Sequence, residues 1–186
     1  MAHTKSARKR IRQDQKRLLR NQSTKTRVKG LTKQFRASID GTDTAASANE
    51  KLNVMVCGVR SRGNHLTHSF AKTRGCHVKY ICDVDETIGK NRVSEFEKRF
   101  GSRTQFVRDM RQGFDDKDLD AVVIATPNHW HALAGILAMQ AGKDAYVEKP
   151  VSHNISEGRR LVETARKYKK ICQTGTQSRS LEGAVA

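Results

Sequence analysis

A short stretch, "GVRSRG" from Gly58 to Gly63, has residue types suited to holding a phosphate group. It follows an apolar run, so a strand should lead into this turn and a helix should leave it. The turn that binds dinucleotides has glycine at its first, third and sixth places, for a tight turn, a close approach to the pyrophosphate and close helix packing. Here Arg60 stands at the third place. The stretch predicts a dinucleotide-binding turn, with an ordinary strand-to-helix turn as the alternative.

An acidic residue, Asp83, ends the next apolar run, 20 residues after Gly63. In dinucleotide-binding folds, a carboxylate at about this separation meets the ribose hydroxyls of NAD and disfavours the 2′-phosphate of NADP. The pair of features therefore indicates NAD as a possible cofactor.

Two further stretches could do chemistry: "ATPNHWHA" at residues 125–132 and "VEKPVSHN" at residues 147–154. Each follows a predicted strand, and doubly wound sheets bind ligands at the carboxyl ends of their strands. Thr126 and Lys149 should therefore lie at the same sheet edge. His129 and His131 could form a metal pair, but no cysteine or carboxylate lies at ligand spacing, so no metal site is predicted.

The segments that position these residues alternate between strand and helix. Strands are predicted at residues 51–58, 77–83, 104–107, 120–126, 144–149 and 171–175, and helices after the glycine turn and at 86–100, 130–142 and 156–169. This alternation predicts an α/β Rossmann-type doubly wound parallel sheet. About 130 residues suffice for such a domain to bury its own core.

The charge of the chain is concentrated at its start. The 186 residues carry a formal net charge of +17, and residues 1–36 contain 13 Lys and Arg against Asp14 alone. So large an excess of basic residues is unusual for a soluble metabolic enzyme. It favours a polyanionic partner, with nucleic acid as the first choice and an anionic membrane surface as the second.

No run approaches the ~18 consecutive apolar residues of a membrane span. The four cysteines show no C-x-x-C pairing, which predicts reduced, partly buried thiols.

The first 40 residues contain a helical pattern. Val28, Leu31, Phe35 and Ile39 are spaced as on one helix face, and the other faces are Lys, Arg and Gln. In a free helix over residues 6–40, the like charges of the Lys and Arg side chains would repel one another. Along a phosphate backbone the same helix would be stabilised, because each neutralised phosphate releases counterions. Composition alone leaves RNA binding and a solvated basic tail equally open.

The segment "MAHTKSARKRIRQDQKRLLRNQSTKTRVKGLTKQFRASIDGTDTAA" resembles the first half of bacterial small-subunit ribosomal protein S-twenty. The resemblance implies a long basic α-helix from a truncated three-helix bundle, in contact with 16S rRNA of the small ribosomal subunit. The implied phosphate contacts are Lys5, Arg8, Lys9, Arg10, Arg12, Lys16, Arg17 and Arg20.

Residues 51–180 resemble the N-terminal NAD(P)-binding half of the Gfo/Idh/MocA oxidoreductase family, through the glycine turn, "CDVD", "DAVVIATPNHWH" and "AGKDAYVEKP". The resemblance implies that Lys149 binds and polarises the substrate and would be the catalytic candidate. It implies these cofactor-side residues: Gly58, Gly63, Asp83, Thr126, Asn128, Glu148 and Lys149.

Together these patterns predict a basic helical rRNA-binding segment at 1–46, a junction at 47–51, a Rossmann-like domain at 52–175 and a tail at 176–186. The junction is compatible with a gene fusion, a gene remnant or a misjoined reading frame. The favoured prediction is a cytoplasmic, ribosome-associated protein that binds 16S rRNA and is not an enzyme, because the family's substrate domain does not follow. The alternatives are an NAD-dependent oxidoreductase or NAD-binding remnant, and an α/β domain without an active site.

Overall fold

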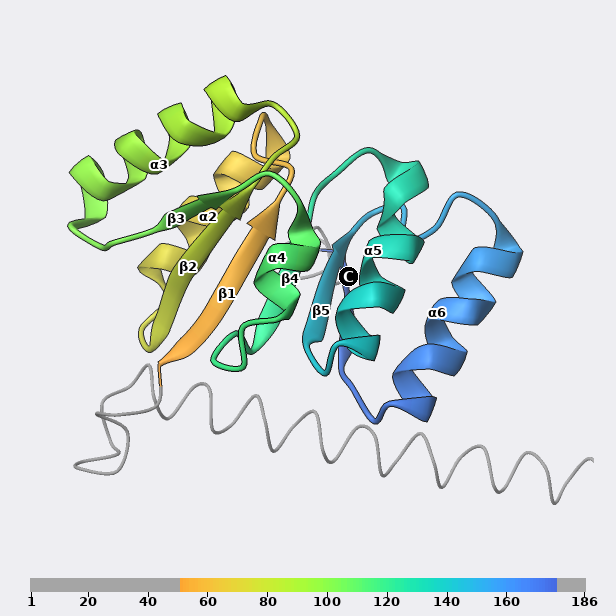
Figure 1. Cartoon of the computed structure of the whole chain (residues 1–186). Coiled ribbons are helices and arrows are strands. Elements are labelled where there is room, and N and C mark those ends of the chain that lie inside the picture. The colour runs from red at the N-terminus through yellow and green to blue at the C-terminus, as the bar shows by residue number, and fades with distance from the viewer. Residues whose placement is uncertain (1–50, 177–186) are drawn as a thin grey trace, which may run out of the picture. The chain divides into compact units, whose positions relative to one another are not determined.

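The computed structural model describes residues 51–176 (Figure 1). The predicted basic helix, all eight predicted RNA contacts and the segment after residue 176 lie outside this range. The predicted domain limits therefore remain predictions. Within residues 51–176, no helix is long and apolar enough to cross a membrane.

Strands and helices alternate along the described chain. The strands are β1 (Leu52–Cys57), β2 (Cys76–Cys82), β3 (Gln105–Val107), β4 (Ala121–Ile124), β5 (Asp144–Glu148) and β6 (Cys172–Gly175). The helices are α2 (Arg62–Lys72), α3 (Glu86–Phe100), α4 (Met110–Phe114), α5 (Asn128–Gln140) and α6 (Ile155–Lys167). The prediction of six strands alternating with helices is confirmed, and strand ends differ from the predicted ones by a few residues.

The six strands form one parallel sheet in the order β3-β2-β1-β4-β5-β6. The chain starts in the middle at β1, winds outward through β2 and β3, and then returns to place β4 on the other side of β1. This order is that of a doubly wound Rossmann sheet, whose two halves meet between β1 and β4. The predicted fold class of this part of the chain is confirmed.

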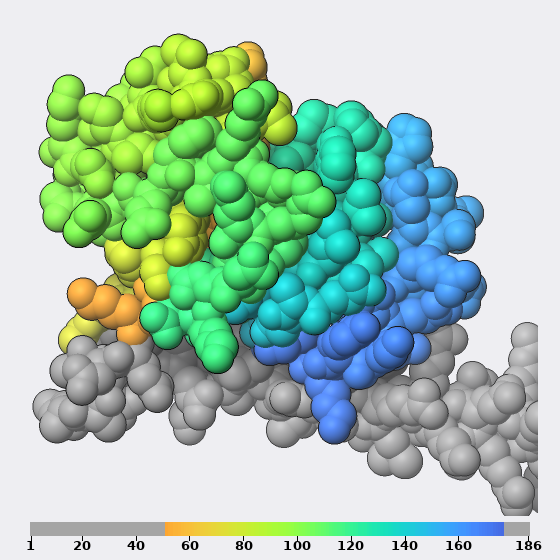
Figure 2. Space-filling view, in the orientation of Figure 1, coloured from red at the N-terminus to blue at the C-terminus, as the bar shows by residue number. Residues whose placement is uncertain are grey.

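The sheet buries a separate core on each face, and β1 contributes to both. Val54 and Val56 pack with Leu66 of α2 and Phe96 of α3. Met55 packs in the other cluster, with residues of α4, α5 and α6, the helices that cover the near face in Figure 2. Because β1 is buried on both faces, its sequence is a continuous apolar run, and each fully buried side chain contributes about 1.5–3 kcal/mol.

Local signals account for most helix ends. The Asp85 side chain caps α3 by accepting the Ile88 N–H at 3.2 Å, and Gly101 ends this helix at a φ of 62°. Residues 86–100 were predicted as this helix, and the prediction is confirmed. Helix α4 was not predicted, because its five residues are too few to show a helical period.

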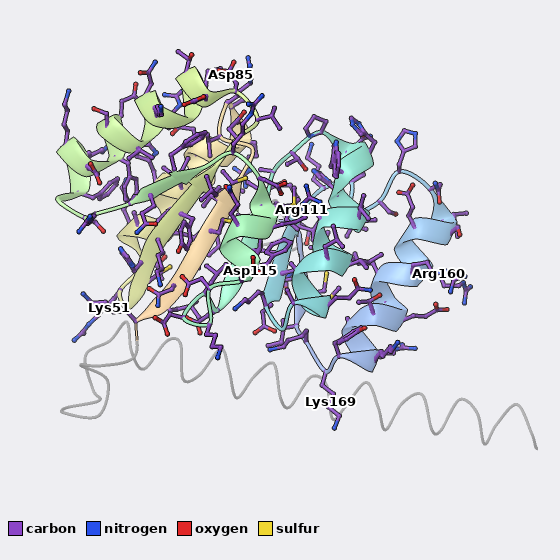
Figure 3. All side chains as sticks on the ribbon, viewed as in Figure 1. Lys51, Asp85, Arg111, Asp115, Arg160 and Lys169 are labelled. Atoms are coloured by element: carbon purple, nitrogen blue, oxygen red, sulfur yellow. The ribbon has the colours of Figure 1, made fainter. Side chains whose placement is uncertain are left out.

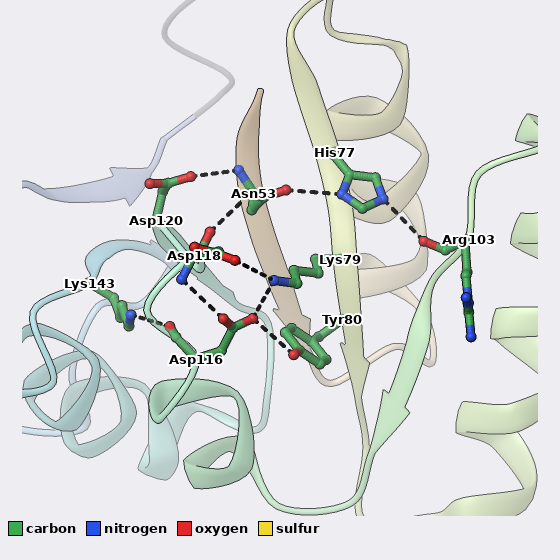
Figure 4. A network of polar contacts seen from close by, with 9 residues as sticks. All are labelled: Asn53, His77, Lys79, Tyr80, Arg103, Asp116, Asp118, Asp120 and Lys143. Carbon is green, nitrogen blue, oxygen red and sulfur yellow. Dashed lines mark hydrogen bonds and ion pairs between the residues drawn. The ribbon is translucent and has the colours of Figure 1, made fainter. Parts of the chain in front are cut away.

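A network of polar side chains joins the amino ends of β1 and β2 to the loop before β4 (Figure 4). Asp116 pairs with Lys79 at 2.6 Å and accepts the Tyr80 hydroxyl at 2.9 Å. Asp120 accepts the Asn53 N–H at 2.8 Å. This loop therefore enters β4 at a fixed register, which sets where the opposite, carboxyl end of β4 lies.

Asp116 should make folding sensitive to acid. Burial raises the pKa of Asp116, but hydrogen bonds from Lys79, the Asp118 N–H and Tyr80 outweigh burial and lower it. A carboxyl whose pKa is lower in the folded state stabilises the fold above its unfolded pKa and loses this contribution as the pH falls through its folded pKa. We expect the free energy of unfolding, from urea titrations, to decrease below about pH 4.

The variant Asp116→Asn should weaken this dependence on pH. Asp118→Asn is the matched control, because the Asp118 side chain is 80% exposed and lies farther from Lys79, at 3.7 Å. A pH profile of Asp116→Asn that superimposes on that of the parent chain would contradict the assignment.

Candidate functional site

A cleft of about 1080 Å³ opens at the carboxyl ends of β1, β2 and β4. It lies where the two halves of the sheet meet, the position at which doubly wound sheets bind ligands. Its wall is formed by these residues: Cys57, Gly58, Arg60, Ser61, Arg62, Cys82, Asp83, Val84, Arg108, Asp109, Met110, Arg111, Gln112, Ala125, Thr126, Pro127, His129, Trp130, Leu133 and Leu137. Figure 3 marks two residues of this end of the sheet, Asp85 before α3 and Arg111 in α4.

Glycine is required at both ends of the turn after β1. Gly58 has a φ of +81°, and a Cβ there would lie 2.8 Å from the carbonyl oxygen of Ala125. A Cβ on Gly63 would lie 1.6 Å from the carbonyl oxygen of Gly58. The backbone of the turn therefore stays close to the β4 loop, and α2 begins directly against it.

Asp83 supports this turn from the end of β2. Its side chain is buried, with the residue 7% exposed. One carboxylate oxygen accepts the Val59 N–H at 2.9 Å, and the other accepts the Asp85 N–H at 3.0 Å. The sequence predicted that Asp83 faces the cleft, which it lines, but not that it holds the backbone of the turn.

Arg60, the departure from the glycine pattern, is accommodated by α3. Its guanidinium pairs with Asp85 at 2.8 Å, and its side chain is 66% exposed. Arg92 of α3 also reaches the turn and donates to the Val59 carbonyl at 3.3 Å. No local pattern could have predicted Arg92, because it lies 33 residues from Val59 in the sequence.

Thr126 offers an unused polar group to the cleft. Of the buried side-chain oxygen and nitrogen atoms in the described residues, only its Oγ1 has no hydrogen-bond partner. Buried polar atoms are seldom left unpaired, so this hydroxyl would gain a partner from a polar ligand group or an ordered water in the cleft. With the two glycines and Asp83, this atom makes the cleft fit a dinucleotide.

The segment after β5 lies beside the glycine turn. Glu148 is 3% exposed, and it accepts from Nε of Arg62, the first residue of α2, at 2.8 Å. This hydrogen bond raises the pKa of Arg62. The Lys149 N–H donates to the other oxygen of Glu148 at 3.2 Å, while the residue itself is exposed.

The cleft also has an apolar side. Trp130 and Leu133 of α5 remain 43% and 47% exposed there. At its floor, a hydrogen bond to Cys82 and then burial raise the pKa of the Cys57 thiol, which stays protonated. Large flat apolar side chains beside a few polar groups are typical of small-molecule sites.

The structure thus brings most predicted site residues to one sheet edge. Gly58, Asp83 and Thr126 line the cleft, and Gly63 sets the approach of α2. The remaining predicted residues stand at the ends of elements at this edge: Asn128 begins α5, Glu148 ends β5 and Lys149 follows it. His131 does not pair with His129, since its ring nitrogens contact the carbonyl oxygens of Thr126 and Pro150 at 2.7 and 2.6 Å.

Residues 52–176, more than half of the chain, match the model of the Gfo/Idh/MocA family, an oxidoreductase family with an NAD-binding Rossmann fold. The chain belongs to this family. Residues 2–61 match a second family model, that of Ribosomal protein S20. Both resemblances seen in the sequence are therefore confirmed. The two matches overlap at residues 52–61, and the structure places these residues in β1 and the glycine turn of the Gfo/Idh/MocA domain.

Curated relatives in the family include two from Shewanella. A "Glycosyl hydrolase family 109 protein" of Shewanella putrefaciens is 33% identical over 65% of this chain and 27% of its own length. An "Alpha-N-acetylgalactosaminidase" of Shewanella oneidensis is 31% identical over 66% of this chain and 28% of its own length. The chain thus spans little more than a quarter of these relatives.

A solved structure with the same fold is the myo-inositol 2-dehydrogenase of Lactobacillus plantarum. It is 21% identical, with a TM-score of 0.62 over 70% of this chain and 38% of the dehydrogenase.

The prediction that the chain is not an enzyme is wrong. The described domain belongs to an oxidoreductase family, and its relatives are named as enzymes. The prediction depended on the absence of a second domain from the sequence.

Gly58 and Gly142 form a matched pair for testing the turn. Both have a φ of +81°, but a Cβ on Gly142 would meet no atom within 4 Å. We expect Gly142→Ala to lower the free energy of unfolding by about 1–2 kcal/mol, the conformational cost alone. Gly58→Ala should cost at least about 1 kcal/mol more, because backbone atoms of the β4 loop must move. Equal urea midpoints for the two variants would refute the close contact.

Proposed function

We propose that the described domain binds NAD and is the cofactor-binding half of a Gfo/Idh/MocA-type enzyme. The orphaned Thr126 hydroxyl is the main observation in support, because it lies in the cleft beside the glycine turn of a domain that matches an NAD-binding Rossmann family. When bound, NAD would supply a nicotinamide ring able to accept or donate a hydride.

The residues of this chain would divide the binding between them. The backbone of the glycine turn and the start of α2 would face the pyrophosphate, since helix N-termini attract anions. Asp83 would accept from ribose hydroxyls, and Thr126 would gain the partner that it lacks. Lys149, exposed at the carboxyl edge, would contact the substrate and stabilise negative charge that develops on its oxygen.

The substrate class that we propose is a sugar derivative, on the basis of the relative named as an alpha-N-acetylgalactosaminidase. Polyhydroxylated rings suit a cleft that exposes the Trp130 ring, with Lys149 following β5 at the same sheet edge, because apolar ring faces stack on aromatic side chains and hydroxyls bind polar groups.

We expect the full chain to bind NADH more tightly than NADPH, by about tenfold, which corresponds to about 1.4 kcal/mol. The physical reason is repulsion between the 2′-phosphate of NADPH and the Asp83 carboxylate. Titrations followed by NADH and NADPH fluorescence measure both affinities.

The variant Asp83→Asn should narrow this preference, because it removes the charge but keeps an oxygen for the Val59 N–H. Glu163→Gln is the control, since Glu163 lies on α6 and pairs there with Arg160 at 3.2 Å. An Arg60→Gly variant, which restores the glycine pattern, should bind NADH at least as well as the parent chain. A flat NADH titration of the parent chain up to millimolar concentrations would overturn the proposal.

A second candidate function is rRNA binding by the segment at residues 1–46. In this proposal, the segment is followed by a junction at 47–51, the nucleotide domain at 52–175 and a tail at 176–186. The match of residues 2–61 to the Ribosomal protein S20 model supports it, and so does the excess of 13 cations over one anion in residues 1–36. Under this proposal the chain would be found on the small ribosomal subunit in the cytoplasm.

Neutralising three predicted contacts tests this candidate. Replacing Arg8, Lys9 and Arg10 by Gln should make the slope of log affinity for a 16S rRNA fragment against log salt less negative by up to about 2.7, at about 0.9 per lost phosphate contact. The control replaces three cations of the α6 end: Arg166, Lys167 and Lys169. Equal losses in the two triple variants would show non-specific attraction and refute the assignment.

A further inference from the structure

The backbone around Lys149 is held on two sides by side chains from two other parts of the site. Arg62, next to the last glycine of the turn, contacts the residue before Lys149, and His131 of α5 contacts the residue after it. Neither residue was predicted to have this role.

On the first side, the Glu148 carboxylate joins the glycine turn to Lys149. One of its oxygens accepts Nε of Arg62 at 2.8 Å and the Tyr146 hydroxyl at 3.4 Å. The other accepts the backbone N–H of Lys149 at 3.2 Å. A Cβ on Gly175 would lie 2.9 Å from this carboxylate, so the neighbouring strand also confines it. A buried carboxylate without such partners would strongly destabilise the fold, so these contacts hold Glu148 in one position.

On the second side, the His131 ring joins the β4 loop to the segment after Lys149. The ring is 3% exposed, and its two nitrogens contact the carbonyl oxygens of Thr126 at 2.7 Å and Pro150 at 2.6 Å. Carbonyl oxygens only accept, so the ring donates to both when both nitrogens are protonated and to one otherwise. The ring spans the two loops that carry the unpaired Thr126 hydroxyl and the Lys149 amine.

We propose that Arg62 and His131 are positioning residues, which fix the Lys149 backbone relative to the cofactor cleft. The inference rests on the proposed function, in which Lys149 lies beside the nicotinamide. Each residue connects Lys149 to a wall of the cleft: Arg62 to the glycine turn, and His131 to the β4 loop. A displacement of a reacting group by about 1 Å can lower the reaction rate about a hundredfold, so a fixed Lys149 backbone would favour catalysis. We call the contacts of Arg62 and His131 on either side of Lys149 the clamp.

Hydrogen exchange of the full chain tests the clamp directly. Arg62→Met and His131→Phe should each accelerate amide exchange several-fold in a peptide spanning residues 145–151, while a peptide from α3 exchanges at its parental rate. Arg62→Lys, which keeps a donor for Glu148, should restore slow exchange. Controls are Arg160→Met, which breaks an exposed pair on α6, and His65→Phe at an exposed site of α2. Unchanged exchange in residues 145–151, or equal acceleration in both peptides, would overturn the proposal.

A second measurement separates positioning from cofactor binding. Acylation of the Lys149 amine by an N-hydroxysuccinimide ester is followed by peptide mass spectrometry, with and without saturating NADH, and with Lys98 of α3 as the internal reference. In the parent chain, NADH should slow the acylation of Lys149. In His131→Phe, whose ring does not line the cleft, NADH should still bind, by fluorescence, but protect Lys149 several-fold less. For Arg62→Met, a cleft-lining position, protection is compared with the parent chain at equal NADH occupancy; it should also fall several-fold, and Arg62→Lys should recover it.

The outcomes distinguish the two levels of inference. A parent chain that does not bind NADH would refute the proposed function, whereas the exchange experiment would still test the clamp. Full protection of Lys149 in both variants, with NADH bound, would refute the clamp and leave the proposed function standing. If Arg62→Met does not fold, His131→Phe alone carries the test, with His65→Phe as its control.

Discussion

The buried carboxylate of Asp83 is the interaction on which the rest of the site depends. It accepts two backbone N–H groups, one from the turn after β1 and one from the start of α3. A carboxylate removed from water needs such donors, because an unpaired charge in this position would cost several kcal/mol. By accepting these two N–H groups, Asp83 ties the ends of β1 and β2 together. The two glycines can then keep the turn close to the β4 loop. The cleft follows from that arrangement.

Much of this arrangement could be predicted from the sequence, because the relevant signals are local. A continuous apolar run indicated β1, the alternation of strand and helix patterns indicated α3, and parallel topology requires Thr126 and Lys149 to share the carboxyl edge. Residues whose role depends on distant partners could not be predicted in this way. Arg92 contacts a carbonyl 33 residues away, and Arg62 contacts a carboxylate 86 residues away. No periodicity or spacing rule reports such pairs before the fold is known.

The error about enzymatic character came from the absence of a second domain in the sequence, and the basic residues 1–36 reinforced it. Net charge reports on association with polyanions rather than on fold or chemistry. The described domain carries its own excess of cations, yet two of those at the cleft, Arg60 and Arg111, are paired with Asp85 and Asp109. Charge summed over a chain cannot show such pairing, whereas geometry does.

Residues 52–61 are matched by two family models, although they can adopt one architecture at a time. As β1, they are the hydrogen-bonded neighbour that β2 and β4 share in the described sheet. If these residues turned into a helix of a bundle, the sheet would divide into two unconnected ribbons, and the crevice between them would vanish. A ribosomal part that replaced residues 52–57 would therefore cost the domain the strand that joins its two halves.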